Sequence, residues 1–304
     1  MIRRKIILSA IVALLGAGSV AAQEGRAVAL PFTRIDRNPR TSALAGAGAA
    51  SISHPGAYQA FRGAAALPFQ KGMLDGGLGV QLWMPTNEVD QSTNIQGGVA
   101  LRFGSFGVAV GGAYDICLPM GDFAPSDRLV GLGLSYAIAN RISLGVNARY
   151  AAQGLAKDFT VSGFSFDVTV LGRITEDLSA TLGVSTLGTT VLSADETPFG
   201  QPSFALAGFA WRKLIGKDHA VEAVLDGEYN FDGTFAGALG AEYAFREMVF
   251  VRAGYRLAAE YALVPSHLSL GLGFSYAGFR ADVSFLTLSP YLGNTFSFGI
   301  GYSF

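Results

Sequence analysis

The chain has 304 residues, of which half are apolar and only 15% are charged, and its formal net charge is −1. This composition excludes a disordered chain, which needs low hydrophobicity and high charge. The single cysteine excludes a disulfide scaffold. Because there is no surplus of basic residues, nucleic acid is not an expected partner.

Residues 1–22 have the organisation of a signal peptide. Arg3, Arg4 and Lys5 precede a short apolar run, and Ala22 ends a segment of small side chains suited to cleavage. A membrane anchor is the alternative, but the apolar run is short for one. We therefore expect the chain to be exported and residues 1–22 to be removed.

Residues 23–72 are rich in alanine and other small residues and show little alternation. Pro39 and Pro55 each mark an expected helix start. About fifty residues of this composition are too many for a disordered leader, so we predict a small helical plug, or hatch, inside a barrel. An exposed periplasmic arm is the alternative. Small side chains would permit close packing against the barrel wall, with Gly46 and Gly48 as candidate contacts.

Residues 73–304 alternate with a period of two and make up the predicted barrel. In the segment 141–151, apolar residues such as Leu144 alternate with polar or small residues such as Asn147. Strand residues two apart share a face, so this pattern predicts one lipid-facing row and one lumen-facing row. About fourteen strands of this kind fit into the segment.

The mature chain contains no apolar run of about 18 residues that could form a spanning helix, and without such helices only a closed barrel satisfies its backbone in lipid. Long connections, such as 152–160 and 188–201, alternate with tight ones such as 139–140, as in bacterial outer-membrane barrels. A soluble β-sandwich would also alternate, but its wet face would carry more charge. The predicted fold class is all-β: a transmembrane antiparallel β-barrel of about fourteen strands with a small N-terminal helical plug.

Several charged residues fall at lumen-facing positions of the predicted strands. Charges in a narrow lumen are costly unless they are paired or hydrated. We therefore expect either a structural network that ties the wall to the plug or a polar patch on a ligand path. The candidate lumen network is Arg149, Asp167, Glu222, Asp226, Glu228, Glu242, Arg252 and Arg256.

The sequence suggests no catalytic or metal-binding constellation. His54, His219 and His267 are scattered, with no second ligand at metal spacing, and Cys117 stands alone at the start of an expected loop. No spacing suggests a serine, histidine and acid that converge. We expect no enzymatic activity, no cofactor and no bound metal.

The segment Pro31–Ser51, followed by an Ala-rich second helix and a barrel that ends in Phe304, resembles the PorV/PorQ group of Bacteroidota outer-membrane proteins. The closest similarity lies in Arg37–Ala50. That group is related in fold to FadL-type transporters of long-chain fatty acids, which are fourteen-stranded barrels with an N-terminal hatch. Where the family carries an Asn-Pro-Ala turn, this chain has Arg62-Gly63-Ala64, and Gly63 could make the turn by backbone freedom. Arg62 and Gly63 are therefore further candidate plug contacts.

The resemblance implies a location in the outer membrane and a role as an accessory or shuttle barrel. Such a barrel docks secreted proteins or a larger outer-membrane machine of the type IX secretion kind. The relation to FadL implies an alternative, a passive transporter of hydrophobic small molecules, and a barrel that serves envelope structure is a third. The expected loops are short for a capture site, which favours docking. Expected partners are outer-membrane lipid, other outer-membrane or secreted proteins, and a hydrophobic ligand.

Overall fold

The computed structural model describes residues 28–84, 91–117, 119, 122–260, 262–289 and 293–304. The predicted signal peptide, residues 1–22, and residues 23–27 of the predicted plug segment lie outside the described residues. In the part of the chain that is described, no helix is both long and apolar enough to cross a membrane.

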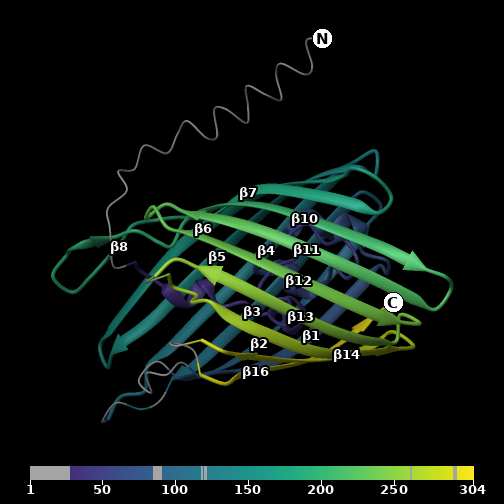
Figure 1. Ribbon diagram of the computed structural model, residues 1–304. Coiled ribbons are helices and arrows are strands. Elements are labelled where there is room, and N and C mark those ends of the chain that lie inside the picture. The colour runs from purple at the N-terminus through teal and green to yellow at the C-terminus, as the bar shows by residue number, and fades with distance from the viewer. Residues whose placement is uncertain (1–27, 85–90, 118, 120–121, 261, 290–292) are drawn as a thin grey trace, which may run out of the picture.

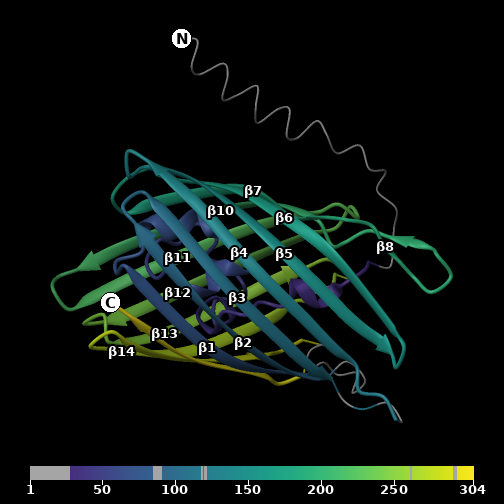
Figure 2. The ribbon, with the colours of Figure 1, turned by 180° about the vertical axis from the view of Figure 1, so that it is seen from behind.

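Antiparallel strands form a closed barrel around the N-terminal segment (Figures 1 and 2). The barrel strands are β1 (Leu74–Trp83), β2 (Ser92–Phe103), β3 (Phe106–Cys117), β4 (Ser126–Ile138), β5 (Ile142–Ala156), β6 (Phe159–Arg173), β7 (Leu178–Gly188), β10 (Phe204–Ile215), β11 (His219–Asn230), β12 (Phe235–Phe245), β13 (Val249–Ala258), β14 (His267–Tyr276), β15 (Phe279–Thr287) and β16 (Thr295–Ser303). The ring closes where β1 pairs with β16. The fourteen strands confirm the predicted fold class. Between β7 and β10, the short strands β8 (Val191–Leu192) and β9 (Pro198–Phe199) form a separate hairpin.

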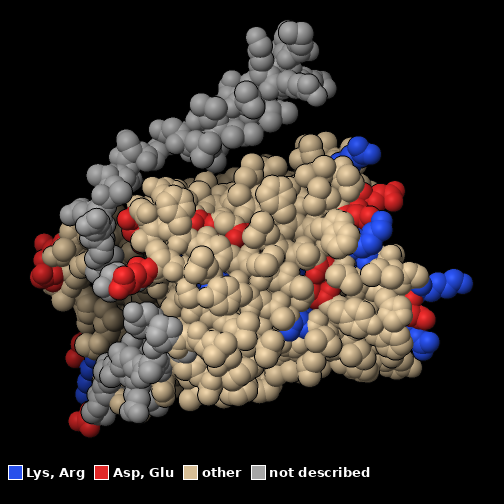
Figure 3. Space-filling model, in the orientation of Figure 1, with Lys and Arg blue, Asp and Glu red and all other residues tan. Residues whose placement is uncertain are grey.

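The strands alternate between the lumen and the outer wall, as their period of two predicts. Along β4, Gly133 and Ser135 are buried, whereas Leu132 and Leu134 are 39% and 48% exposed. This pattern repeats around the ring, so large apolar side chains cover the outside. Figure 3 shows the result: a broad band poor in charge, with acidic and basic residues gathered mostly toward the two ends.

One end of the barrel has very short turns. The connections Ala139-Asn140, Arg246-Glu247 and Ala277-Gly278 each have both residues at positive φ. Two-residue turns of this type match the twist of the flanking strands. The predicted tight connections are therefore confirmed, and we refer to this end as the turn end. The β8–β9 hairpin lies at the opposite end, the loop end (Figure 1).

At the loop end, β5 and β6 run beyond their predicted limits. The predicted loop 152–160 is reduced to two residues, because the ladder continues through the pair Ala156 and Phe159 after an irregularity. Alternation fails there, since the consecutive residues Ala151 and Ala152 are both buried. A period-two pattern therefore could not locate the true strand ends.

The plug occupies the inside of the barrel (Figure 1). Its described helical elements are three of about one turn, η1 (Pro31–Arg34), α2 (Pro39–Ser42) and η2 (Ala57–Ala60), and a 3-10 helix of two turns, η3 (Ala64–Phe69). The predicted helix start at Pro39 is confirmed, and the Asn38 side chain caps it by accepting the N–H of Arg40 at 3.0 Å. The start predicted at Pro55 falls two residues before η2.

Glycines in the wall let the plug backbone approach closely. A Cβ at Gly145 would lie 2.2 Å from the Ala65 nitrogen, and one at Gly254 would lie 2.3 Å from the Leu44 carbonyl carbon. Real Cβ atoms do not come this near to other atoms, so only glycine fits at these wall positions. The close packing of a small-residue segment against the lumen is therefore confirmed for the described residues.

Candidate functional site

Three plug arginines, spaced by three residues, reach the wall on nearly opposite sides. All three are buried, and each meets a wall carboxylate. The ion pairs are Arg34–Glu228 at 2.6 Å, Arg37–Asp115 at 2.8 Å, Arg40–Glu222 at 2.9 Å and Arg40–Glu242 at 2.9 Å. Because β3 carries one acceptor and β11 and β12 the others, these charge-assisted bonds hold the plug across the lumen.

Glu242 is the centre of the first charged cluster. It accepts hydrogen bonds from Arg40 and, at 2.6 Å, from Arg252 Nε. Arg40 also reaches Glu222, so a plug residue joins two of the predicted lumen carboxylates. His54 Nε2 lies 3.9 Å from Glu242. Burial lowers the pKa of His54 and the neighbouring Arg40 charge lowers it further, so this imidazole is neutral.

Glu228 is the centre of the second charged cluster. Its Oε2 accepts from Arg34 at 2.6 Å and from Arg256 at 2.5 Å. Arg62 approaches the other oxygen, Oε1, at only 3.8 Å. One carboxylate therefore faces three guanidinium groups.

Arg149 and Asp167 form a third, separate pair at 2.5 Å. Both groups also bond to Thr186 of β7, whose φ is +56°. The β6–β7 register shifts at this point, which is the signature of a bulge. The eight predicted lumen charges are therefore all buried inside the barrel, but they divide among separate groups rather than forming one continuous network.

The remaining predicted residue of this set, Asp226, binds the plug backbone. Its Oδ2 accepts the N–H groups of Gly48 and Ala49, both at 3.0 Å. Gly46, Gly48 and Gly63 have φ values of +80°, +112° and +79°. A Cβ at Gly48 would lie 3.8 Å or more from its neighbours, which is ordinary contact. These glycines are therefore needed for their backbone conformation, and the tight approach expected at Gly46 and Gly48 occurs instead at glycines of the wall.

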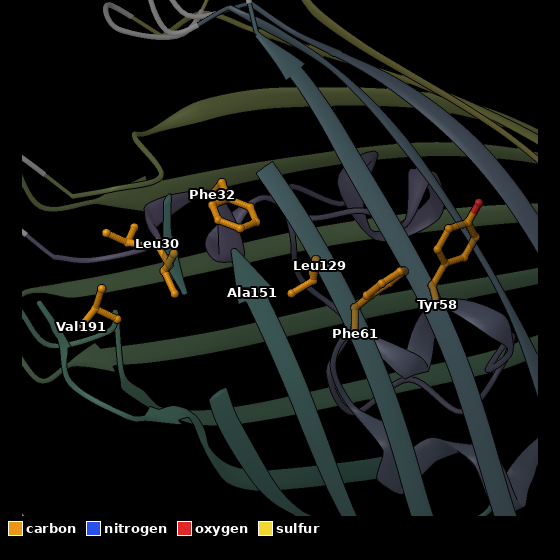
Figure 4. Packing of buried hydrophobic residues seen from close by; sticks show 8 residues of the cluster. Leu30, Phe32, Tyr58, Phe61, Leu129, Ala151 and Val191 are labelled. Carbon is orange, nitrogen blue, oxygen red and sulfur yellow. The ribbon is translucent and has the colours of Figure 1, made fainter. Parts of the chain in front are cut away.

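An apolar row, which we call the apolar seam, runs along the other side of the lumen. Figure 4 shows it extending from the β8–β9 hairpin, beside the N-terminal end of the plug, to the middle of the barrel. The plug and the strands β4, β5 and β6 contribute to it. Its members are Leu30, Phe32, Tyr58, Phe61, Leu129, Ala151, Val161 and Val191. The seam therefore lies along β4–β6, strands that also carry the Arg149–Asp167 pair. The two larger charged clusters lie along β11–β13, which we call the charged side of the lumen.

Among the described residues, two of the cavities lie between the seam and the charged side. The larger, of about 80 Å³, is lined by Phe61 and Leu129 of the seam and by Asp36 and Arg62. The smaller, of about 30 Å³, shares Asp36 and Arg62 and extends past Trp83. The shared residues place Arg62 where the two cavities adjoin.

Within the described residues, no three or more His, Cys, Asp or Glu side chains are grouped to hold a metal ion. The three histidines lie apart. His219 at the turn end contacts the Tyr243 hydroxyl at 2.6 Å, and His267 Nδ1 lies 2.8 Å from the Pro265 carbonyl oxygen.

Four residues of the plug–wall ion pairs were not predicted as site residues: Arg34, Arg37, Arg40 and Asp115. A signal for them exists: Arg34, Arg37 and Arg40 recur every third residue in a segment otherwise rich in small residues. Asp115 also occupies a lumen position two residues from Ala113, and the residues that precede it on this strand face are glycine and alanine. A regular spacing of cations and an inward acid together indicate a tether between plug and wall.

No protein-family model and no curated protein matches this sequence. Solved structures match its fold. The "CymD monoaromatic hydrocarbon channel" has a TM-score of 0.65 and 15% identity, covering 88% of this chain and 97% of that chain. The toluene transporter TbuX of Ralstonia pickettii has a TM-score of 0.63 and 12% identity, covering 87% and 97%. A FadL homologue of Pseudomonas aeruginosa has a TM-score of 0.56 and 13% identity, covering 88% and 98%.

The chain therefore has a FadL-like barrel fold. The names of these neighbours describe channels, transporters and a FadL homologue rather than enzymes. None of the three is named as a PorV/PorQ protein, and these comparisons do not show membership of that group.

Proposed function

We propose that this protein is an outer-membrane channel for hydrophobic small molecules. The observation that carries the proposal is the apolar seam, which follows the lumen from the loop end to the larger cavity. An apolar solute leaves water favourably only where it meets apolar surface, and a wholly charged lumen would offer none. The shared fold with a hydrocarbon channel and a toluene transporter supports the same solute class.

The outer wall supports the membrane location. Aromatic pairs lie near both rims, such as Phe106–Tyr136 at 4.7 Å at the turn end and Tyr150–Phe164 at 5.1 Å toward the loop end. Aromatic girdles that flank an apolar band are typical of outer-membrane barrels. The exported location expected from residues 1–22 agrees with this proposal.

The two sides of the lumen would behave differently during passage. On the charged side, buried ion pairs such as Arg40–Glu242 hold the plug. Along the seam, dispersion contacts such as that between Phe61 and Leu129 hold the plug, and each such contact is individually weak. The hydrogen bonds on this side come from Asn147 of β5 to the Ala64 N–H and the Gln59 carbonyl oxygen, which lie outside the seam. A hydrophobic solute would therefore pass by displacing seam side chains while the charged side stays tethered.

Uptake of labelled toluene by cells that express the protein tests the proposal. Leu129→Asn places an amide in the seam. A toluene molecule passing there would cover the amide without hydrogen bonding to it, which costs about 1–3 kcal/mol, so we expect uptake to fall about tenfold. Leu171→Asn is the matched control, because Leu171 is equally buried but packs against Ala65 and Ala66 outside the seam. Uptake no greater than in cells without the protein, or equal loss in both variants, would refute the proposal.

The docking role implied by the PorV/PorQ resemblance predicts a different result from the channel. Purification in mild detergent would then yield a stoichiometric protein partner. A barrel that purifies alone and transports toluene supports the channel.

A further inference from the structure

Two parts of the plug come together beside the inner part of the apolar seam. Asp36 lies between η1 and α2, and Arg62 lies between η2 and η3. Both residues line both cavities. Phe61, the residue before Arg62, belongs to the seam and lies next to Leu129 (Figure 4). The inner seam therefore borders two opposite charges that different parts of the plug contribute.

Asp36 and Arg62 both have hydrogen-bonding groups to spare. The Asp36 Oδ1 accepts from the Thr41 hydroxyl at 3.0 Å, whereas its Oδ2 is buried and has no hydrogen-bond partner among the described residues. Arg62 donates to the Gly46 carbonyl oxygen at 3.4 Å and lies 3.8 Å from Glu228. Because an arginine carries five N–H donors, most of those on Arg62 are left for other acceptors.

The pKa values of the two groups show that they act on each other. Burial by itself lowers the pKa of the Arg62 guanidinium, but the acids around it raise that pKa above its ordinary value, and Asp36 contributes most among them. Burial raises the pKa of the Asp36 carboxyl, and Arg62 opposes this rise more than any other group does. Each side chain is therefore the main electrostatic partner of the other.

The cavities have room for water between these two groups. The larger one, of about 80 Å³, can take several water molecules, and the smaller one, of about 30 Å³, can take one or two. A buried water usually makes about three hydrogen bonds to polar groups that lack other partners. Hydration also favours the charged form of Asp36, because it offsets the burial of the carboxylate.

We propose that ordered water links Asp36 Oδ2 to the Arg62 guanidinium, and that this water-bridged pair is a latch between the two parts of the plug. The latch itself does not depend on transport, and only its role in passage rests on the proposed function. Because Phe61 and Arg62 are consecutive, a solute that displaces Phe61 also moves Arg62 away from Asp36. An apolar solute must therefore break the latch before the inner seam opens.

A double-mutant cycle on the purified full-length barrel in detergent tests the latch. Asp36→Asn and Arg62→Gln should each speed the cutting of the plug about tenfold, with a protease that does not cleave at arginine. The double variant should be cut about tenfold more slowly than the product of the two effects, because both substitutions remove one interaction. In the control, Asp36→Asn with Arg102→Gln, the effects should multiply, since Arg102 donates to the Gly72 and Lys71 carbonyl oxygens near the turn end. Multiplied effects of Asp36→Asn and Arg62→Gln would refute the latch.

A second measurement does not depend on the folding of variants. Crystals of the unaltered protein should show ordered water within hydrogen-bonding distance of both Asp36 Oδ2 and Arg62. A dry cavity, or direct contact between the carboxylate and the guanidinium, would overturn the water bridge.

Toluene uptake tests the role of the latch in passage. Uptake should rise about tenfold in Asp36→Asn, in step with the cutting rate, because the solute no longer has to break the latch. Unchanged uptake in this variant would overturn that role. Absence of uptake by the unaltered protein would refute the channel and leave the result of the double-mutant cycle standing.

Discussion

An alanine at Gly145 would place a methyl group inside the plug backbone. The Cβ would lie 2.2 Å from the Ala65 nitrogen, whereas non-bonded atoms settle roughly 3.5 Å apart. The turn η3 would therefore move from the wall by more than about 1 Å. On the same strand, Asn147 accepts the Ala64 N–H at 3.1 Å and donates to the Gln59 carbonyl oxygen at 2.7 Å. That movement would break these bonds as well.

The magnitude follows from these two effects. Overpacking of a close contact costs about 1–3 kcal/mol, and a buried polar group left without its partner costs about 1–3 kcal/mol. We expect a combined loss of about 3 kcal/mol, which is a factor of more than about 100 in the equilibrium between the seated and displaced plug. This loss of stability should affect the seating of the plug and not the barrel, because the backbone hydrogen bonds of β5 are unchanged.

Limited proteolysis in detergent measures whether the plug is seated, and heat-modifiable migration on gels measures whether the barrel is closed. Gly145→Ala should expose the plug to protease while the barrel still migrates as folded. The control is Gly172→Ala on the neighbouring strand β6, where a Cβ meets nothing within 4 Å. If protease cuts the plugs of both variants at the same rate, the packing argument is wrong.

Three further predictions concern single side chains. Leu132 is 39% exposed on the outer wall at the middle of β4, so Leu132→Arg should cost about 2–4 kcal/mol, as expected near the bilayer midplane; unchanged folding yield in lipid bilayers would contradict this assignment. Glu228→Gln leaves three guanidinium groups around a neutral amide and should destabilise the docked plug by about 3–5 kcal/mol. Limited proteolysis should therefore cut the plug faster in this variant, but not in Asp195→Asn on an exposed loop. Because the pKa of His54 is lowered in the folded protein, the unfolded chain takes up this proton first as the pH falls below about 6.5. The free energy of unfolding should therefore decrease toward acid by up to about 1.4 kcal/mol per pH unit. This slope should be smaller in His54→Gln, and identical pH profiles would count against a buried neutral imidazole.

Local pattern was enough to predict the barrel. Side-chain direction in a strand alternates whatever the strand pairs with, so the rows of Leu132 and Leu134 against Gly133 and Ser135 on β4 are visible in the chain alone. Tight turns such as Ala139-Asn140 are also local, because two residues at positive φ determine them. The close packing of the N-terminal segment is also predictable from the chain alone, because the size of its side chains limits how near its backbone can come to any neighbouring surface.

The partners of the charges depended on the tertiary structure. Arg37 meets Asp115 on β3, while Arg34 and Arg40 meet β11 and β12 on the other side, and the stagger of strands around the closed ring decides which acids face which turn of the plug. The bulge at Thr186 and the place of Arg62 beside Glu228 arise in the same way. Sequence determines which face of a strand a residue occupies, whereas distances across the lumen exist only once fourteen strands have closed around the plug.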